Sequence, residues 1–140
     1  MKILFVCKAN VGRSQMAEAF FNKLNQNEEN ESWSAGVQVN EHEGETIGEN
    51  KKAQFVVDVI NEEGIDVSSN IRNQLTSEMA DNSDKIIMMA ERELLPGFLK
   101  DSDKVVFWSV MDGKDTSYET HVQIRDEIKE LVEELIEELR

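Results

Sequence analysis

The sequence predicts an α/β fold in which helices cover both faces of a parallel sheet, and three observations support this. Short apolar runs typical of buried strands alternate along the chain with longer segments of helical spacing. Strands that alternate with helices are normally parallel, because each helix carries the chain back to the starting edge of the sheet. The 140 residues contain no repeat and no linker rich in proline or glycine, so we expect one domain spanning residues 1–140.

Each expected element is recognised by its apolar pattern. The strands are short and apolar, and we expect them at residues 3–6, 33–35, 85–89 and 104–108. The helices carry apolar residues on one face, and we expect them at residues 14–21, 51–62 and 122–139. Glutamates between residues 127 and 138 are interpreted as the solvent-exposed face of the last helix. The polar stretches 25–31 and 37–50 are expected to be loops.

The composition of the chain argues against several classes of function. Lysine and arginine number 15 against 29 acidic residues, a net charge of −14, so the chain is not expected to bind nucleic acid. No apolar run approaches the length needed to cross a membrane, and no secretory signal is evident, so a cytoplasmic location is expected. The single cysteine forms no internal disulfide and excludes a metal site built on several cysteines.

The most informative segment runs from Val6 to Ser14 and reads V-C-K-A-N-V-G-R-S. It places the only cysteine, Cys7, at the end of an expected strand and Arg13 at the start of an expected helix. Such a junction directs backbone N–H groups and the positive end of the helix dipole into the loop, which suits a phosphate-like dianion. The same field favours the thiolate form of Cys7, a competent nucleophile. Arg13 offers a planar, two-pronged contact to an oxyanion, and Ser14 offers a hydroxyl.

Each of these residues also has a simpler interpretation. A lone cysteine at a strand end is usually a small buried hydrophobe, and Arg-Ser is a common way to begin a helix. The combination of strand, cysteine, five residues, arginine, serine and helix meets the geometric needs of an anion-binding nucleophile. We therefore predict an active site here.

The segment from Cys7 to Ser14, continued by Gln15-Met16-Ala17-Glu18-Ala19, resembles the signature of the low-molecular-weight protein-tyrosine-phosphatase superfamily, which also contains arsenate reductases. Weaker similarity extends through residues 34–36, 63–66, 73–76 and 108–112. The resemblance implies a three-layer sandwich with a central four-stranded parallel sheet and helices on both faces. It also implies that Cys7 attacks phosphorus and forms a thiophosphoryl intermediate.

The resemblance further assigns roles within the loop. Arg13 is expected to hold the substrate oxygens together with the backbone amides, Asn10 to brace the loop, and Ser14 to stabilise the thiolate. The substrate-binding residues implied in this way are Lys8, Ala9, Asn10, Val11, Gly12 and Ser14. No metal or organic cofactor is implied.

A phosphatase of this kind also needs an acid that protonates the departing oxygen and then activates water. Asp112 is the best candidate, because it follows the last expected strand at the position where the superfamily carries its catalytic aspartate. The usual Asp-Pro pair is here Asp112-Gly113, which removes the stiffness that proline would give the loop. Asp115 lies close enough to be an alternative, and either residue could be an ordinary turn aspartate.

Two departures from the superfamily pattern leave alternatives open. Gly12 stands where many tyrosine phosphatases have a second cysteine, and residues 90–93 lack the relay cysteines of thioredoxin-coupled arsenate reductases. A single-cysteine arsenate reductase that uses an external small-molecule thiol remains an alternative, as does a weakly catalytic oxyanion-binding module. The expected partners are a phosphorylated protein, or a small phosphate or arsenate oxyanion with a cellular thiol as reductant.

The remaining aromatic residues and histidines carry weaker predictions. Trp33 and Trp108 lie in strand-like contexts and are expected in the core. His42 and His121 lie in polar stretches, so both are expected to be exposed and neither is assigned a role. Tyr118 is the only aromatic residue close behind Asp112 that could contact a phenolic substrate.

Overall fold

The computed structural model, which describes residues 1–140, contains one sheet of four parallel strands in the order β2-β1-β3-β4. Strand β1 is central and pairs with β2 along its whole length and with β3 over four residues. Its apolar run is buried on both faces, as the sequence pattern of a central parallel strand predicts. The strands are β1 (Lys2–Cys7), β2 (Glu31–Gly36), β3 (Lys85–Met88) and β4 (Val105–Phe107).

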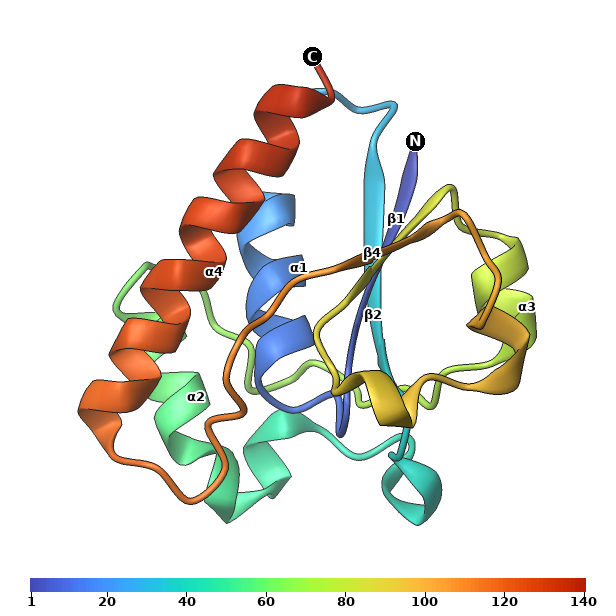
Figure 1. Cartoon of the computed structure of the whole chain (residues 1–140). Helices are drawn as coiled ribbons and strands as arrows, with labels where there is room; N and C mark the ends of the chain where they lie inside the picture. The colour runs from blue at the N-terminus through green and yellow to red at the C-terminus, as the bar shows by residue number, and fades with distance from the viewer.

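Helices lie on both faces of this sheet. They are α1 (Arg13–Leu24), α2 (Gln54–Asn61), α3 (Ser77–Asp81) and α4 (Tyr118–Glu138). Figure 1 shows α1, α2 and α4 on one side of the sheet and the short α3 on the other. Helix α4 packs against α1 and α2, so this side forms the thicker layer. The predicted three-layer α/β sandwich with four parallel strands is confirmed.

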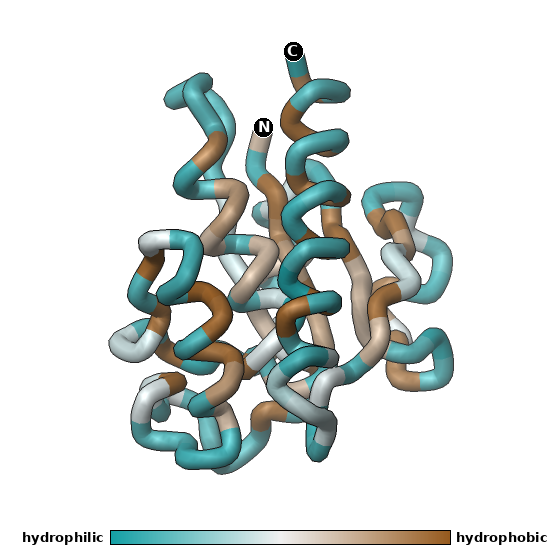
Figure 2. The backbone as a smooth tube through the Cα atoms, turned by 90° about the vertical axis from the view of Figure 1, so that its left-hand side faces the viewer, coloured by the Kyte–Doolittle hydropathy of each residue, from teal (hydrophilic) through white to brown (hydrophobic).

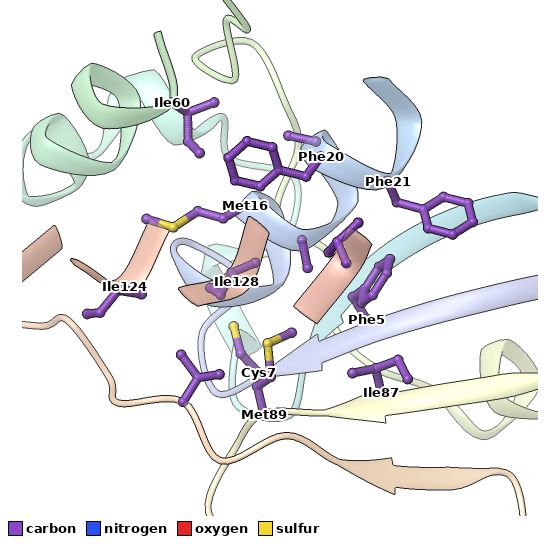
Figure 3. Packing of buried hydrophobic residues seen from close by; sticks show 14 of the residues in the cluster. Phe5, Cys7, Met16, Phe20, Phe21, Ile60, Ile87, Met89, Ile124 and Ile128 are labelled. Atoms are coloured by element: carbon purple, nitrogen blue, oxygen red, sulfur yellow. The ribbon is translucent and has the colours of Figure 1, made fainter. Parts of the chain in front are cut away.

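Each face of the sheet has its own hydrophobic cluster. Ile3, Phe5 and Cys7 of β1 belong to the cluster under α1, α2 and α4, whereas Leu4 and Val6 belong to the cluster under α3. This division follows from the alternation of side chains along a strand. Figure 3 shows Cys7 where β1 ends, among the buried residues on the α1 side. The strand therefore delivers the cysteine directly beneath the start of α1.

Helix α4 has one buried and one solvated face. Ile124, Ile128 and Val132 recur every four residues and are buried, whereas the glutamates between residues 127 and 138 are exposed. Figure 2 looks onto α4 and shows mostly hydrophilic colour on the turns that face the viewer. The predicted solvated face is confirmed. No helix in the chain is both long enough and apolar enough to span a membrane.

The boundaries of several elements differ from those predicted. The predicted helix at residues 51–62 begins as a 3-10 turn at Lys51–Ala53 and becomes α-helical only in α2. Helix α4 begins four residues earlier than expected, because Ser117 caps it by accepting a hydrogen bond from the amide of Thr120. Helix α3 was not predicted, since a segment of five residues is too short to show a helical period.

The prediction that Trp33 is a core residue is wrong. Its side chain is 43% exposed, because the alternation of edge strand β2 turns Ser32 and Ser34 inward and Trp33 outward. Trp108 does pack against the core, with its ring 5.9 Å from that of Phe5. The inward side of β2 is thus polar, and Ser34 takes part in the site described next.

Candidate active site

The loop between β1 and α1 forms a concave row of free amide groups. The backbone N–H groups of residues 8–12 make no hydrogen bond to a protein acceptor. The backbone of residues after β2 runs alongside, with the amides of Val37 and Gln38 donating to the carbonyls of Cys7 and Lys8. These contacts turn the loop's carbonyls away from the concave side and leave the N–H groups available to an anion.

A set of side-chain hydrogen bonds behind the loop fixes its shape. Asn10 is fully buried with a left-handed backbone (φ 54°), and its amide nitrogen donates to Ser14 Oγ (2.8 Å) and Ser34 Oγ (3.0 Å). Its Oδ1 accepts from the backbone amide of Asn73 (2.8 Å) and from Gln15 Nε2 (3.2 Å). All four hydrogen-bonding capacities of one buried amide are therefore satisfied, which locks the unusual backbone conformation.

Ser14 connects this network to the cysteine. Its hydroxyl lies 3.0 Å from Cys7 Sγ and already accepts a hydrogen bond from Asn10. No other acceptor is within reach of Ser14, so its hydroxyl hydrogen points at the sulfur. Ser14 therefore presents a hydrogen-bond donor to the sulfur of Cys7, which is buried at the base of the loop.

The network continues from Ser34 to a partly buried carboxyl group. Ser34 Oγ donates to Glu18 Oε1 (2.6 Å). Burial raises the pKa of Glu18, and the hydrogen bond from Ser34 opposes that shift only in part. Because the Ser34 hydroxyl donates to Glu18, its oxygen accepts from Asn10. Donor and acceptor are therefore assigned for every hydrogen bond in the network that links Glu18 to Cys7.

Arg13 is held rigidly at the first position of α1. It is 4% exposed, and its Nη1 donates to the carbonyl oxygens of Met89 and Val110 (3.0 Å to the latter). These two carbonyls follow the ends of β3 and β4, so the sheet itself anchors the guanidinium. Nε and Nη2 make no such bonds, which leaves one edge of the planar group free to contact two oxygens of an anion.

The two aspartates considered as the acid lie in different environments. Asp112 Oδ2 lies 3.7 Å from Arg13 Nη2, and its Oδ1 accepts from the amide of Lys114 (3.0 Å). Asp115 lies at the exposed tip of the same turn with a left-handed backbone (φ 62°). Both border the cavity described below, but only Asp112 contacts Arg13. Asp112 is therefore the better placed of the two.

The concave side of the loop opens into a cavity of about 770 Å³. Cys7, Arg13 and Asp112 border it, as do four of the predicted binding residues, Lys8, Ala9, Val11 and Gly12. Asn10 and Ser14 do not line it, because their side chains are fully buried behind the loop. The structure thus gathers seven of the nine predicted site residues around one cavity, whereas Asn10 and Ser14 support the loop from behind.

Positive charge is concentrated around this cavity. Six of the 15 cationic side chains of the chain border it, against four of the 29 acidic ones. The cationic residues are Lys8, Arg13, Lys51, Lys52, Arg72 and Lys114. No group of three or more histidine, cysteine, aspartate or glutamate side chains is placed to hold a metal ion. The cavity thus combines a cationic lining with the buried thiol of Cys7.

Two supporting residues were not predicted from the sequence. Arg72 is buried and donates through Nε and Nη2 to the carbonyl of Ala9, at 3.2 and 3.1 Å. Gly36 lies so close to the loop that an added Cβ would be 2.7 Å from the amide nitrogen of Asn10. Both lie within or beside segments with weak similarity to the superfamily, and that was the only signal pointing to them.

Comparisons with known proteins agree with this geometry. Residues 2–140 match the low molecular weight phosphotyrosine protein phosphatase family. A solved low molecular weight protein tyrosine phosphatase from T. tengcongensis is 30% identical, with a TM-score of 0.83 and 99% of each chain covered. A comparison with curated proteins found no match.

Two further solved structures bear on the chemistry. One is the YwlE arginine phosphatase, in a cysteine-to-serine mutant with a phosphorylated active-site serine; it is 27% identical, with a TM-score of 0.83 over 99% of this chain and 95% of that one. The other is an arsenate reductase in the phosphate-binding state, 26% identical, with a TM-score of 0.75 over 99% of this chain and 98% of that one. The family match and these structures indicate a phosphatase enzyme, and the lone cysteine fits a cysteine-dependent one. Because the match spans nearly the whole chain, the protein belongs to the low molecular weight phosphotyrosine protein phosphatase family.

Proposed function

We propose that Cys7, Arg13 and Asp112 are the catalytic residues of a phosphatase that hydrolyses phosphate monoesters, either protein phosphotyrosine or small aryl phosphates. The observation that carries the proposal is the position of Cys7 Sγ, which receives the Ser14 hydroxyl at the base of a loop of free amides. A thiolate held there faces the phosphorus of any phosphate bound by those amides.

In the first step, Cys7 Sγ attacks phosphorus as the bond to the leaving oxygen breaks, and Asp112 gives its proton to that oxygen. The free edge of Arg13 and the amides of residues 8–12 hold the three equatorial oxygens, over which negative charge is spread in the transition state. In the second step, Asp112 takes a proton from water as the water oxygen attacks phosphorus. The S–P bond breaks, and the products are inorganic phosphate and the Cys7 thiolate.

The test of the nucleophile is Cys7→Ser, because serine fits the same space but is not ionised at neutral pH. Turnover of an aryl phosphate should vanish, whereas binding of inorganic phosphate and the unfolding temperature should stay close to wild type. A variant with activity within about tenfold of wild type, or ~1.4 kcal/mol in barrier, would remove Cys7 from this role.

The test of the acid compares Asp112→Asn with Asp115→Asn. Loss of the general acid should slow the hydrolysis of phenyl phosphate by ~100-fold or more. The hydrolysis of p-nitrophenyl phosphate should be much less affected, since its leaving oxygen hardly needs a proton. We expect this pattern for Asp112→Asn alone. The reverse pattern would transfer the role to Asp115.

A second candidate function is arsenate reduction, in which Cys7 would attack arsenic and an external thiol would supply the electrons. The likeness to a solved arsenate reductase supports this alternative, and because the chain has one cysteine and no internal relay, the reductant would have to be external. If wild-type protein reduces arsenate with added small-molecule thiol and hydrolyses neither aryl phosphate nor a phosphotyrosine peptide, this function replaces the phosphatase. Binding of phosphate without either reaction would identify an oxyanion-binding module.

A further inference from the structure

His121 occupies a place that the sequence did not indicate. It was expected to be exposed, but it is 6% exposed and lies beneath the loop that carries Asp112. An added Cβ on Gly113 would lie 3.1 Å from His121 Nε2, and the Phe55 ring packs edge-on against the imidazole at 5.4 Å between centroids. The imidazole therefore fills the space between α2 and the loop backbone, and a glycine at position 113 leaves room for it.

The hydrogen-bond network assigns the proton of this imidazole. Nδ1 lies 2.9 Å from the carbonyl oxygen of Ser117, which can only accept. Nδ1 also lies 3.2 Å from Thr116 Oγ1, and the hydroxyl of Thr116 already donates to the carbonyl of Gly113 (2.6 Å). Nδ1 is therefore the protonated nitrogen and donates to both groups. The loop is tied to α4 through one side chain, in the order Gly113, Thr116, His121.

The other nitrogen of the ring is free. Nε2 has no protein hydrogen-bond partner, and no buried side-chain nitrogen or oxygen in the chain lacks one, so Nε2 reaches the solvent of the cavity. His121 thus combines one nitrogen that is fixed to the loop with one that faces the cavity bordered by Cys7 and Asp112.

We propose that His121 is a positioning residue for the catalytic acid: through Nδ1 and Thr116 it fixes the backbone at Gly113 and so holds Asp112 beside Arg13. The inference rests on the proposed role of Asp112. Glycine at 113 would otherwise leave the backbone of the acid loop free to rotate. In this chain, the hydrogen-bonded side chain of His121 restricts the loop backbone, which Gly113 itself does not. A general acid whose orientation is fixed protonates the leaving oxygen more effectively than one that moves between orientations.

The experiment uses two amide substitutions that each keep one nitrogen of the ring. His121→Asn places an amide nitrogen near Nδ1 and retains the bonds to Thr116 and Ser117, whereas His121→Gln places one near Nε2 and loses them. Turnover of phenyl phosphate and of p-nitrophenyl phosphate is measured for both variants, and each is also placed in the Asp112→Asn background. Thermal unfolding of every variant reports whether it is folded.

If His121 positions the acid, His121→Gln should slow the hydrolysis of phenyl phosphate by about tenfold or more. This is a part of the ~100-fold effect expected when the acid is lost entirely. His121→Gln should change the rate of p-nitrophenyl phosphate hydrolysis by no more than about twofold. His121→Asn should hydrolyse both substrates at rates close to wild type. In the Asp112→Asn background, His121→Gln should add nothing, because the group that it positions is gone.

Other results overturn the inference. A merely structural role predicts that His121→Gln slows both substrates alike, in step with its unfolding temperature. Retained activity in His121→Gln with loss in His121→Asn would show that Nε2 acts and that Nδ1 does not. If Asp112→Asn itself shows no dependence on the leaving group, the assignment of the acid fails and the inference falls with it. If the rate of Asp112→Asn depends on the leaving group but that of His121→Gln does not, the inference about His121 is overturned while the assignment of Asp112 stands.

Discussion

The substitution Asn10→Ala tests whether the network behind the loop, and not the loop's own backbone preference, keeps the amides in place. Asn10 has a left-handed backbone (φ 54°) and a fully buried side chain with four hydrogen bonds. Asn40 is the matched control, because its backbone is left-handed as well (φ 55°) but its exposed side chain makes no hydrogen bond. Asn40→Ala therefore changes only the backbone preference, at a cost of ~1 kcal/mol.

The expected difference between the two variants follows from the four lost bonds. A buried hydrogen bond contributes ~0.5–1.5 kcal/mol net, so four contribute about 2–6 kcal/mol. The backbone cost is shared by both variants and cancels in the comparison. Total stability of a domain is ~5–15 kcal/mol, so Asn10→Ala should remain measurable in urea unfolding at low temperature.

The assay is the free energy of unfolding of both variants, together with the affinity for inorganic phosphate. We expect Asn10→Ala to lose about 2–6 kcal/mol more than Asn40→Ala and to bind phosphate weakly, because the loop amides no longer converge. Asn40→Ala should bind phosphate like wild type. Equal losses in the two variants would show that the four bonds do not hold the loop, and the account of the site would be refuted.

Two other changes test the site from different sides. Arg13→Lys keeps the charge but cannot contact the carbonyls of Met89 and Val110 while also gripping two substrate oxygens, so kcat/KM for an aryl phosphate should fall ~100-fold or more; near-normal kinetics would contradict this role. The pKa of Glu18 is raised because the partly buried carboxyl is shielded from water. Folding therefore favours its protonated form, and the resulting loss of stability begins as pH rises through ~4.3, the usual pKa of a glutamate in an unfolded chain. Glu18→Gln should match wild-type stability at low pH and become the more stable of the two above that range; a difference that does not change with pH would oppose this reading.

Local sequence was sufficient to predict one half of the site. Cys7, Arg13 and Ser14 lie within eight residues, and a strand followed by a helix fixes where each one points. The parallel sheet then places the loop at its carboxyl edge, where open α/β sheets bind ligands. Asp112 was named from the resemblance to the superfamily, and the structure places it after β4, beside Arg13.

The other half depends on contacts between distant segments, which no local pattern encodes. Arg72 supports the loop from 63 positions away, and Gly36 matters because of what its missing side chain would touch. His121 lies in a polar stretch that is typical of an exposed residue, yet the turn before α4 folds over it. Trp33 shows the opposite error, because it was expected in the core and is exposed. On edge strand β2 the alternation of side chains turns the neighbouring serines inward and Trp33 outward. In each case tertiary packing decided the environment of the side chain.

The charge distribution explains how so acidic a chain serves an anionic substrate. A net charge of −14 repels anions at long range, but at physiological salt this repulsion is screened beyond ~8 Å. Within that distance the substrate meets a cavity bordered by six cationic and four acidic side chains. Two of the cations, Arg13 and Arg72, are buried and anchored to backbone carbonyls, so their charge is fixed in place before the substrate arrives. The acidic surface therefore lies largely outside the region that governs binding, and the local field, together with the free amides of residues 8–12, sets the affinity for the phosphate.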